Sequence, residues 1–205
     1  MPAFDCFDEI RCIHRANLPG VRTKMEARFA KLGIADRVRA HTAVSTPGNP
    51  AVSQVLSHRQ LIAEAQAAGR HSVLVFEQDV LFLDRSCAVI QAAAGELDRV
   101  EWRTCRLGGV PRTGELLARP GLTHWRTGDC FGFVHALAHH QRVFEKILAD
   151  VPADFDGVHN WLQSASSLET YFATLADNIV LVPRIATLAS LLPYEDPADH
   201  ASFTI

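Results

Sequence analysis

The stretch HSVLVFEQDVLFLD (residues 71–84) places two carboxylates inside the most apolar segment of the chain. Four apolar residues lead into Glu77-Gln78-Asp79, and four more apolar residues follow. A short apolar run of this kind, bounded by polar residues, is typical of a strand that is buried on both faces of a sheet. The stretch therefore predicts a core strand over 72–76 that ends in an acidic pair.

Strands and helices are predicted to alternate on both sides of this strand. Apolar residues at helical spacing and glycine stops indicate the helices, and short apolar runs indicate the strands. The predicted strands cover residues 10–14, 37–43, 72–76, 102–108, 129–135 and 178–183. The predicted helices cover residues 20–33, 51–68, 85–98, 136–149 and 166–176. This alternation predicts an α/β fold with a mostly parallel, Rossmann-like sheet flanked by helices.

The length and composition are typical of one globular domain. The chain has 205 residues, of which 48% are hydrophobic and 21% charged, and its formal net charge is −3. A chain of this size buries a sufficient core without disulfides. We expect a single domain over 1–205, in which the polar, proline-broken stretch 189–205 is a loose tail. The net charge gives no general attraction to nucleic acid, so no nucleic-acid partner is expected.

The cysteines and the N-terminus bear on the compartment. The five cysteines are scattered and form no CxxC pair, which is typical of free thiols in a reducing compartment. Residues 1–15 carry acids where a signal peptide has a basic region. No apolar stretch reaches the roughly 20 residues that span a bilayer. We predict a cytoplasmic protein without a transmembrane segment, and peripheral membrane association stays open.

The acidic pair suits a metal site at the rim of a sheet. Ligands of open α/β sheets bind beyond the carboxyl ends of the strands. On an extended strand Glu77 and Asp79 point to the same side, where two carboxylates can share Mg²⁺ or Mn²⁺. Such a cation can neutralise a diphosphate as a bond breaks. The same spacing fits two ordinary surface acids at a strand end, so on spacing alone both interpretations stand.

The neighbouring residues carry a resemblance to a known family. The segment VSQVLSHRQLIAEAQAAGRHSVLVFEQDVLFL (52–83) resembles the core of glycosyltransferase family 25, which includes lipooligosaccharide galactosyltransferases. That family has a Ser-His pair on a helix, then a glycine, then a strand ending in Glu-Asp-Asp. The matching positions here are Ser57-His58, Gly69 and Glu77-Gln78-Asp79.

Weaker matches extend the resemblance over most of residues 10–188. Residues 13–34 are similar to the opening strand, turn and helix of the family, with matches at Pro19, Arg22, Met25 and Gly33. Residues 132–148 and 166–188 resemble its late strand and helix and its closing helix and strand. Two departures stand out. Gln78 replaces the middle aspartate, and Ile-His-Arg at 13–15 replaces the usual Ile-Asn-Leu.

The resemblance implies a GT-A-like fold and a metal-dependent glycosyltransferase. The enzyme would move a sugar from a nucleotide-sugar donor to a glycan acceptor of the lipooligosaccharide type, as in lipopolysaccharide biosynthesis. Asp79, with Glu77 beside it, would hold Mn²⁺ or Mg²⁺. Arg22 would contact the donor diphosphate, because a guanidinium matches phosphate oxygens, and the alternative is an ordinary arginine on the surface of a helix. His58 either faces the donor or supports the following strand through a hydrogen bond. The implied donor-binding residues are Arg22, His58, Glu77 and Asp79.

The acceptor hydroxyl needs a general base. The candidates for this catalytic role are Glu169, Asp129 and Asp156, each of which also fits a structural or helix-capping acid. Because Gln78 lowers the charge of the acidic triplet by one, an inactive relative that binds a nucleotide-sugar, a glycan or a protein partner is the alternative. A nucleotidyltransferase is a third hypothesis, which the absence of a GxGxxG or GxxxxGK(S/T) phosphate loop disfavours.

Two features outside the acidic segment also suggest ligand binding. If 136–149 is helical, His135 and His139 lie on one face of that helix. A zinc site needs further ligands nearby, so we expect these histidines to form a packed or solvated cluster. Trp125, in the glycine-rich segment 109–128, is the candidate for stacking on a sugar.

Overall fold

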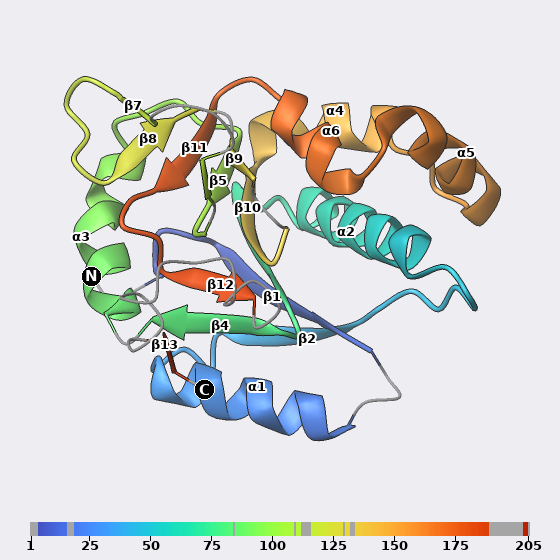
Figure 1. Cartoon of the computed structure of the whole chain (residues 1–205), viewed down its shortest axis with the longest axis horizontal. Helices are drawn as coiled ribbons and strands as arrows, with labels where there is room; N and C mark the ends of the chain where they lie inside the picture. The colour runs from blue at the N-terminus through green and yellow to red at the C-terminus, as the bar shows by residue number, and fades with distance from the viewer. Residues whose placement is uncertain are drawn as a thin grey trace.

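The structure, a computed structural model, describes residues 4–15, 19–83, 85–108, 110–111, 116–128, 130–131, 134–188 and 203–204. Its main sheet has eight strands in the order β2-β1-β3-β10-β5-β11-β8-β7 (Figure 1). Their bounds are β1 (Glu9–His14), β2 (Val38–Thr42), β3 (Ser72–Glu77), β5 (Thr104–Arg106), β7 (Leu117–Ala118), β8 (Trp125–Thr127), β10 (Ala136–His140) and β11 (Asn178–Leu181). Two small sheets contain β4 (Val80–Leu83), β12 (Ala186–Leu188) and β13 (Phe203–Thr204), and β6 (Val110–Pro111) and β9 (Cys130–Phe131).

Most strands of the main sheet run in the same direction. β1 pairs in parallel with β2 and with β3, and β11 pairs in parallel with β5. β10 lies antiparallel between β3 and β5, and β8 is antiparallel to β11 and β7. The predicted α/β class, with a mostly parallel sheet flanked by helices, is confirmed.

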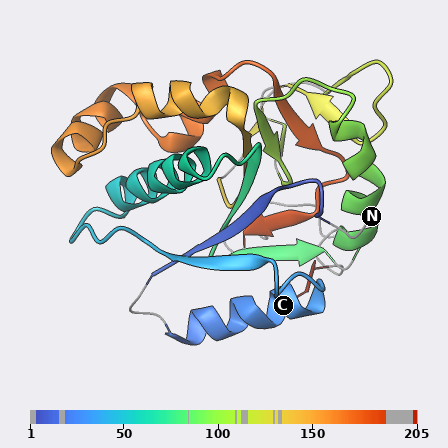
Figure 2. The same cartoon turned by 180° about the vertical axis from the view of Figure 1, so that it is seen from behind.

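Helices cover both faces of this sheet. Their bounds are α1 (Pro19–Lys31), α2 (Pro50–Ala67), α3 (Ser86–Leu97), α4 (Gln141–Asp150), α5 (Phe155–Ala165) and α6 (Leu168–Thr174). α2, α4, α5 and α6 pack on one face, and α1 and α3 pack on the other together with β4 (Figures 1 and 2). The sequence-based prediction included the other helices but missed α5, although Asp154 caps its N-terminus by accepting a hydrogen bond from the N–H of Gly157.

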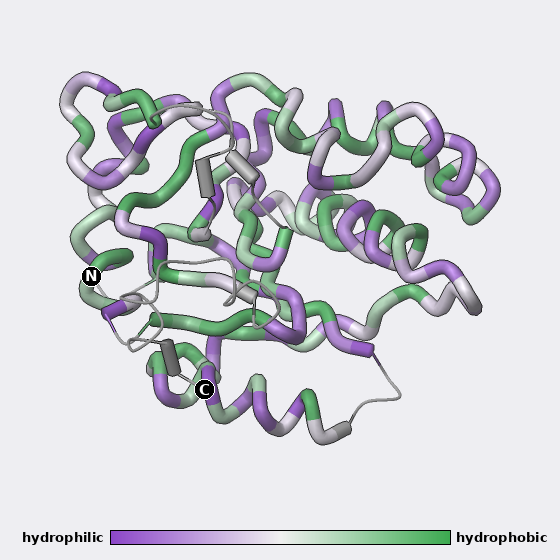
Figure 3. Tube along the Cα trace, viewed as in Figure 1, coloured by the Kyte–Doolittle hydropathy of each residue, from purple (hydrophilic) through white to green (hydrophobic). Residues whose placement is uncertain are grey.

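The strand β3 is buried on both faces, as its apolar run predicts. Val73 and Val75 belong to the core beneath α2, whereas Leu74 and Phe76 belong to the core beneath α1 and α3. Side chains alternate between the faces of a sheet, so two apolar layers need a continuous apolar run. Glu77 follows the same alternation and therefore faces α2. The tube in Figure 3 shows a similar unbroken hydrophobic run along β4.

The predicted helix over 136–149 is wrong in its first residues. Residues 136–140 form β10, which pairs with both β3 and β5, and the helix begins at Gln141. A short run such as ALAHH suits either a buried strand or a buried helix, so periodicity cannot separate the two. Residues 136–140 form a strand because the buried backbone N–H and C=O groups along the facing edges of β3 and β5 need hydrogen-bond partners, which β10 provides.

The chain leaves the main sheet directly after Glu77. Gln78 and Asp79 form a turn, and Val80 begins β4 in a different sheet. The expectation that Glu77 and Asp79 lie on one extended strand is therefore wrong. β4 pairs with β12 and with β13, so Phe203–Thr204 of the predicted tail contacts the body of the protein. The remainder of 189–205 lies outside the described residues.

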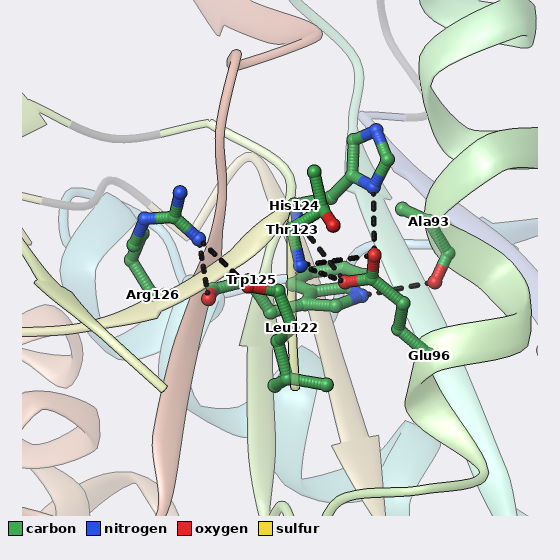
Figure 4. A network of polar contacts seen from close by, with 7 residues as sticks. All are labelled: Ala93, Glu96, Leu122, Thr123, His124, Trp125 and Arg126. Carbon is green, nitrogen blue, oxygen red and sulfur yellow. Dashed lines mark hydrogen bonds and ion pairs between the residues drawn. The ribbon is translucent and has the colours of Figure 1, made fainter. Parts of the chain in front are cut away.

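Trp125 is a core residue, not an exposed platform for a sugar. Its side chain is fully buried, and its Nε1 donates a hydrogen bond of 3.0 Å to the carbonyl oxygen of Ala93 on α3 (Figure 4). An indole that is buried with its N–H satisfied contributes packing and direction to the core. The prediction that Trp125 stacks on a sugar is wrong, because α3 covers the ring.

Glu96, on α3, binds the backbone of the segment that precedes β8. Its carboxylate accepts hydrogen bonds from the backbone N–H groups of Thr123 and His124, and His124 Nδ1 lies 2.9 Å from Oε1 (Figure 4). Burial raises the pKa of Glu96, but these hydrogen bonds outweigh burial and hold the pKa below its usual value. Glu96 is thus an ionised anchor between two distant parts of the chain.

We expect Gly108→Ala to destabilise the protein severely. A Cβ at position 108 would lie 2.0 Å from the carbonyl oxygen of Ala186 and 2.9 Å from His135 Nε2, so the backbone must move. The loss in free energy of unfolding should be about 3 kcal/mol or more, measured by urea denaturation. Gly95→Ala on α3 is the matched control, because its Cβ meets nothing within 4 Å. Gly95→Ala should stabilise the helix by up to about 1 kcal/mol, and equal stability of the two variants would contradict the observed packing.

We expect Glu96→Gln to lower stability at pH 7 by about 1–3 kcal/mol, because an amide cannot accept all of these hydrogen bonds. The folded-state pKa of Glu96 is depressed, so its contribution is present above the unfolded pKa of roughly 4.3 and is lost as the pH falls through the folded value. The difference in stability between wild type and Glu96→Gln should therefore shrink in acid. A difference that stays constant from pH 7 to pH 3 would contradict the ionised anchor.

Candidate functional site

A polar pocket opens at the carboxyl ends of β1 and β3. Its volume is about 250 Å³, and the N-terminal half of α2 forms one wall. A second hollow of about 480 Å³ continues along the loop 43–50 and shares lining residues with the first. The polar residues at the floor and rim of the pocket include Arg15, Gln54, Glu77, Gln78 and Asp79. The position matches the general rule for ligand sites of α/β sheets.

Glu77 is the innermost acid of this pocket. Its Oε1 accepts a hydrogen bond of 2.6 Å from Gln54 Nε2, and His58 Nε2 lies 3.4 Å from the same oxygen. Burial pushes the pKa of Glu77 upward. The hydrogen bonds from His58 and Gln54 and the charge of His58 outweigh burial, so the pKa of Glu77 is lowered. Glu77 is therefore an ionised carboxylate at neutral pH.

Asp79 lines the same pocket from the turn that follows β3. The prediction that Glu77 and Asp79 lie close together is correct, but the reason given for it is not. Asp79 reaches the pocket through the turn after β3 and not through the alternation of side chains along a strand. Partial burial and the negative charge of Glu77 raise the pKa of Asp79, and Arg15 and Arg28 oppose this effect. Two like charges that share one pocket repel each other, and a bound cation would relieve this repulsion.

Gln78 has a structural task between the two acids. Its Oε1 accepts a hydrogen bond of 2.9 Å from the backbone N–H of Arg15, which ties the end of β1 to the turn after β3. This bond needs only a neutral acceptor, so an amide serves as well as a carboxylate at this position. The amide of Gln78 is therefore sufficient for this connection between the two strands.

Arg15 brings a positive charge to the site. It lines both the pocket and the adjoining hollow. Arg22, the arginine that the resemblance selects, lies on α1, pairs with Glu26 at 2.8 Å and borders a different hollow. The structure therefore does not bring Arg22 to Glu77. The signal for Arg15 was available in the sequence, because a charged residue directly after a predicted strand marks its carboxyl end.

The first turn of α2 forms part of the pocket wall. Asn49 caps the helix by accepting a hydrogen bond of 3.1 Å from the N–H of Val52, and Pro50 begins the helix. Pro50 and Ala51 line the pocket. The N-terminus of a helix carries partial positive charge and attracts anions such as phosphate. The same pocket thus combines acids for a cation with positive groups for an anion.

Two serines of α2 fix the loop that follows β2. Ser53 Oγ donates a hydrogen bond of 2.5 Å to the carbonyl oxygen of Val44, and Ser57 Oγ accepts one of 2.9 Å from the N–H of Val44. The loop is held on α2 by both polar groups of one residue. The walls of the pocket that α2 and this loop provide therefore form one connected unit.

His58 supports Glu77 from beneath. The side chain is fully buried and does not line the pocket, and its ring packs against His139 and Phe172 at centroid distances of 6.4 and 6.1 Å. Of the two roles considered for His58, the structure agrees with the supporting one. Its position in the core below Glu77 keeps it from direct contact with a ligand in the pocket.

The candidate bases are not gathered around this pocket. Asp156 is exposed in the first turn of α5, and Glu169 is half-buried in the first turn of α6. Neither lines the pocket of Glu77, and Asp129 lies outside the described residues. The catalytic role of each of these acids stays a prediction.

The histidines form no metal centre of their own. His139 lies on β10, fully buried, and burial lowers its pKa, so the ring is neutral. His135 precedes β10 and burial lowers its pKa to about 4. Among the residues that the structure describes, no three or more His, Cys, Asp or Glu side chains are grouped to hold a metal. Because residues 136–140 form a strand, the helical face that was expected to bring His135 and His139 together does not exist, and that expectation is wrong.

Comparison with known proteins gives a loose likeness of fold. No protein-family model matches the chain, and no curated protein is significantly similar in sequence. A glycosyltransferase involved in the glycosylation of the major capsid of PBCV-1 is 9% identical, with a TM-score of 0.44 over 84% of this chain and 80% of that chain. A UDP-glucose pyrophosphorylase, solved with UDP-glucose, is 13% identical, with a TM-score of 0.42 over 86% and 73%.

A third solved structure, mannose-1-phosphate geranyltransferase from Thermus thermophilus, is 15% identical, with a TM-score of 0.45. The match covers 86% of this chain but 60% of that chain, so the present chain spans well under the full length of that protein. No helix in the described part of the chain is long and apolar enough to cross a membrane. At these TM-scores the shared arrangement is loose, and the residues of the pocket have to carry any statement on function.

Proposed function

We propose that the protein is a glycosyltransferase that takes a sugar from a nucleotide-sugar donor with the help of Mn²⁺ or Mg²⁺ and passes it to a glycan acceptor. One observation carries this proposal. Glu77 and Asp79 line the same pocket as Arg15 and the first turn of α2. A nucleoside diphosphate with its cation presents both signs of charge, which is what this pocket complements. The lipooligosaccharide type of the acceptor comes from the family resemblance alone.

The residues of the pocket fit a hard divalent cation. Carboxylate oxygens are the ligands that Mg²⁺ and Mn²⁺ prefer, and Glu77 is held in its ionised form. The cation, when bound, supplies positive charge that stabilises the leaving diphosphate. Glu77 and Asp79 would supply two oxygen ligands to such a cation, and further oxygen ligands, such as those of a bound nucleotide, would be needed beside them. We therefore expect cation and nucleotide to bind together more strongly than either alone.

The positive groups of the pocket would hold the diphosphate. Arg15 offers a guanidinium, and the N-terminus of α2 offers the partial positive charge of a helix start. In the reaction, the bond between the anomeric carbon and the diphosphate oxygen breaks, and the acceptor oxygen forms the new bond to that carbon. The hydroxyl proton passes to a base, for which Glu169, Asp129 and Asp156 are the proposed candidates.

A relative that binds the donor without turning it over is the second candidate. Two observations favour it. The side-chain oxygen of Gln78 already accepts a hydrogen bond from the backbone N–H of Arg15. The described residues bring no third His, Cys, Asp or Glu side chain to Glu77 and Asp79. A nucleotidyltransferase would use the same charges, and its product, a pyrophosphate-linked nucleotide, distinguishes it from a glycosyltransferase.

We expect UDP- or GDP-sugars with Mn²⁺ to raise the melting temperature of the protein, and to be hydrolysed slowly. Asp79→Asn should lose the Mn²⁺-dependent part of the stabilisation and the hydrolysis, because it removes one ligand charge. Glu145→Gln, which changes an exposed acid on α4, is the control and should behave as wild type. Stabilisation without hydrolysis supports the non-catalytic relative, and no stabilisation by any donor contradicts both candidates.

We expect Arg15→Ala to weaken UDP binding roughly tenfold, since hydrogen bonds to charged groups contribute about 1.5–3 kcal/mol. Arg22→Ala is the matched variant and should change the affinity less than twofold, because Arg22 lies outside the pocket. Isothermal titration with UDP and Mn²⁺ measures both. The opposite order of effects would place the diphosphate on the α1 side of the sheet and refute this site.

A further inference from the structure

We propose that Gln54 is a positioning residue that presents one oxygen of Glu77, Oε2, to the cation. This inference rests on the proposed function and adds a determinant of cation affinity that the sequence did not reveal. Gln54 lies on α2, faces the pocket and contacts Glu77 directly. Gln54 is not a metal ligand in this proposal, because its role is to donate a hydrogen bond from its amide nitrogen to the carboxylate of Glu77.

The two oxygens of Glu77 have different surroundings. Oε1 accepts the hydrogen bond of 2.6 Å from Gln54 Nε2, and His58 Nε2 approaches it at 3.4 Å. Among the described residues, Oε2 makes no hydrogen bond, and Glu77 lines the pocket. Oε2 is therefore the oxygen left for a ligand.

The main chain of Glu77 is fixed independently of its side chain. Its N–H donates a hydrogen bond of 3.0 Å to the carbonyl oxygen of His135, as part of the sheet. The remaining freedom lies in the side-chain torsions, and the two contacts to Oε1 restrict them. Fixing a ligand before the cation arrives lowers the entropy cost of binding.

Gln54 makes the shorter of the two contacts and makes it from the wall of the pocket. Its amide is neutral, so it orients Glu77 without repelling a cation in the pocket. A lysine or arginine at this position would satisfy Glu77 but would add a positive charge beside the cation. The helix that carries Gln54 is itself fixed, since Ser53 and Ser57 bind Val44 on either side of it.

The test compares Gln54→Met with Gln60→Met. Methionine has nearly the size of glutamine and lacks the donor. Gln60 makes the same kind of bond on the same helix, from Nε2 to Glu64 Oε1 at 2.9 Å, but outside the pocket. Titration of Mn²⁺ with UDP present, followed by electron paramagnetic resonance, gives the cation affinity. Thermal melting of both variants reports any general loss of folding.

We expect Gln54→Met to weaken Mn²⁺ binding about tenfold or more, as changes to groups that orient metal ligands do. Gln60→Met should leave the Mn²⁺ affinity and the UDP affinity unchanged, and Gln54→Met should change the UDP affinity in EDTA much less than it changes the Mn²⁺ affinity. In a Glu77→Ala background, Gln54→Met should have no further effect on Mn²⁺ affinity, because Gln54 acts through Glu77.

The outcomes separate this inference from the function it rests on. If wild type binds no Mn²⁺ in the presence of UDP, the proposed cation-dependent function fails, and the inference with it. If wild type binds Mn²⁺ and Gln54→Met binds it equally well, the positioning role of Gln54 is refuted while the proposed function stands. An equal loss with and without Glu77 would refute positioning in favour of direct contact with the ligand.

Discussion

The hydrogen bond between Gln54 and Glu77 is the contact on which the site depends. Glu77 ends a strand whose side chains are buried on both faces, so its carboxylate emerges from the core with little water around it. A charge in such a place needs partners within the protein. Gln54 and His58 provide them from α2. When α2 packs on β3, it therefore also brings the hydrogen-bond partners that orient the carboxylate of Glu77. The pocket lies between these two elements.

The charges around the pocket are balanced in a particular way. Glu77 and Asp79 line the pocket together with Arg15 and the N-terminus of α2. Acids alone would repel a phosphate, and positive groups alone would need no cation. The combination complements a ligand that carries a diphosphate and a divalent cation together. This reasoning uses only the residues of the site, which matters because the solved structures with a similar arrangement are distant.

The middle residue of the acidic segment, Gln78, has a structural role. Its side-chain oxygen accepts a hydrogen bond from the backbone N–H of Arg15, and an amide and a carboxylate can both accept such a bond. Gln78 lines the pocket together with Glu77 and Asp79, which carry the negative charge. Arg15, after the end of β1, supplies a positive charge to the same pocket, and its backbone N–H is the hydrogen-bond partner of Gln78.

The sequence by itself determined β3, α2, most other helices and the acidic pair, because apolar runs, helical spacing and glycine stops are local patterns. Tertiary structure decided what depends on residues far apart in the chain. β10 is a strand because β3 and β5 leave backbone edges to fill, and Trp125 is buried because α3 covers it. Likewise Arg15 and Gln54, not Arg22, reach the acids, since only the sheet order and the packing of α2 fix which side chains meet.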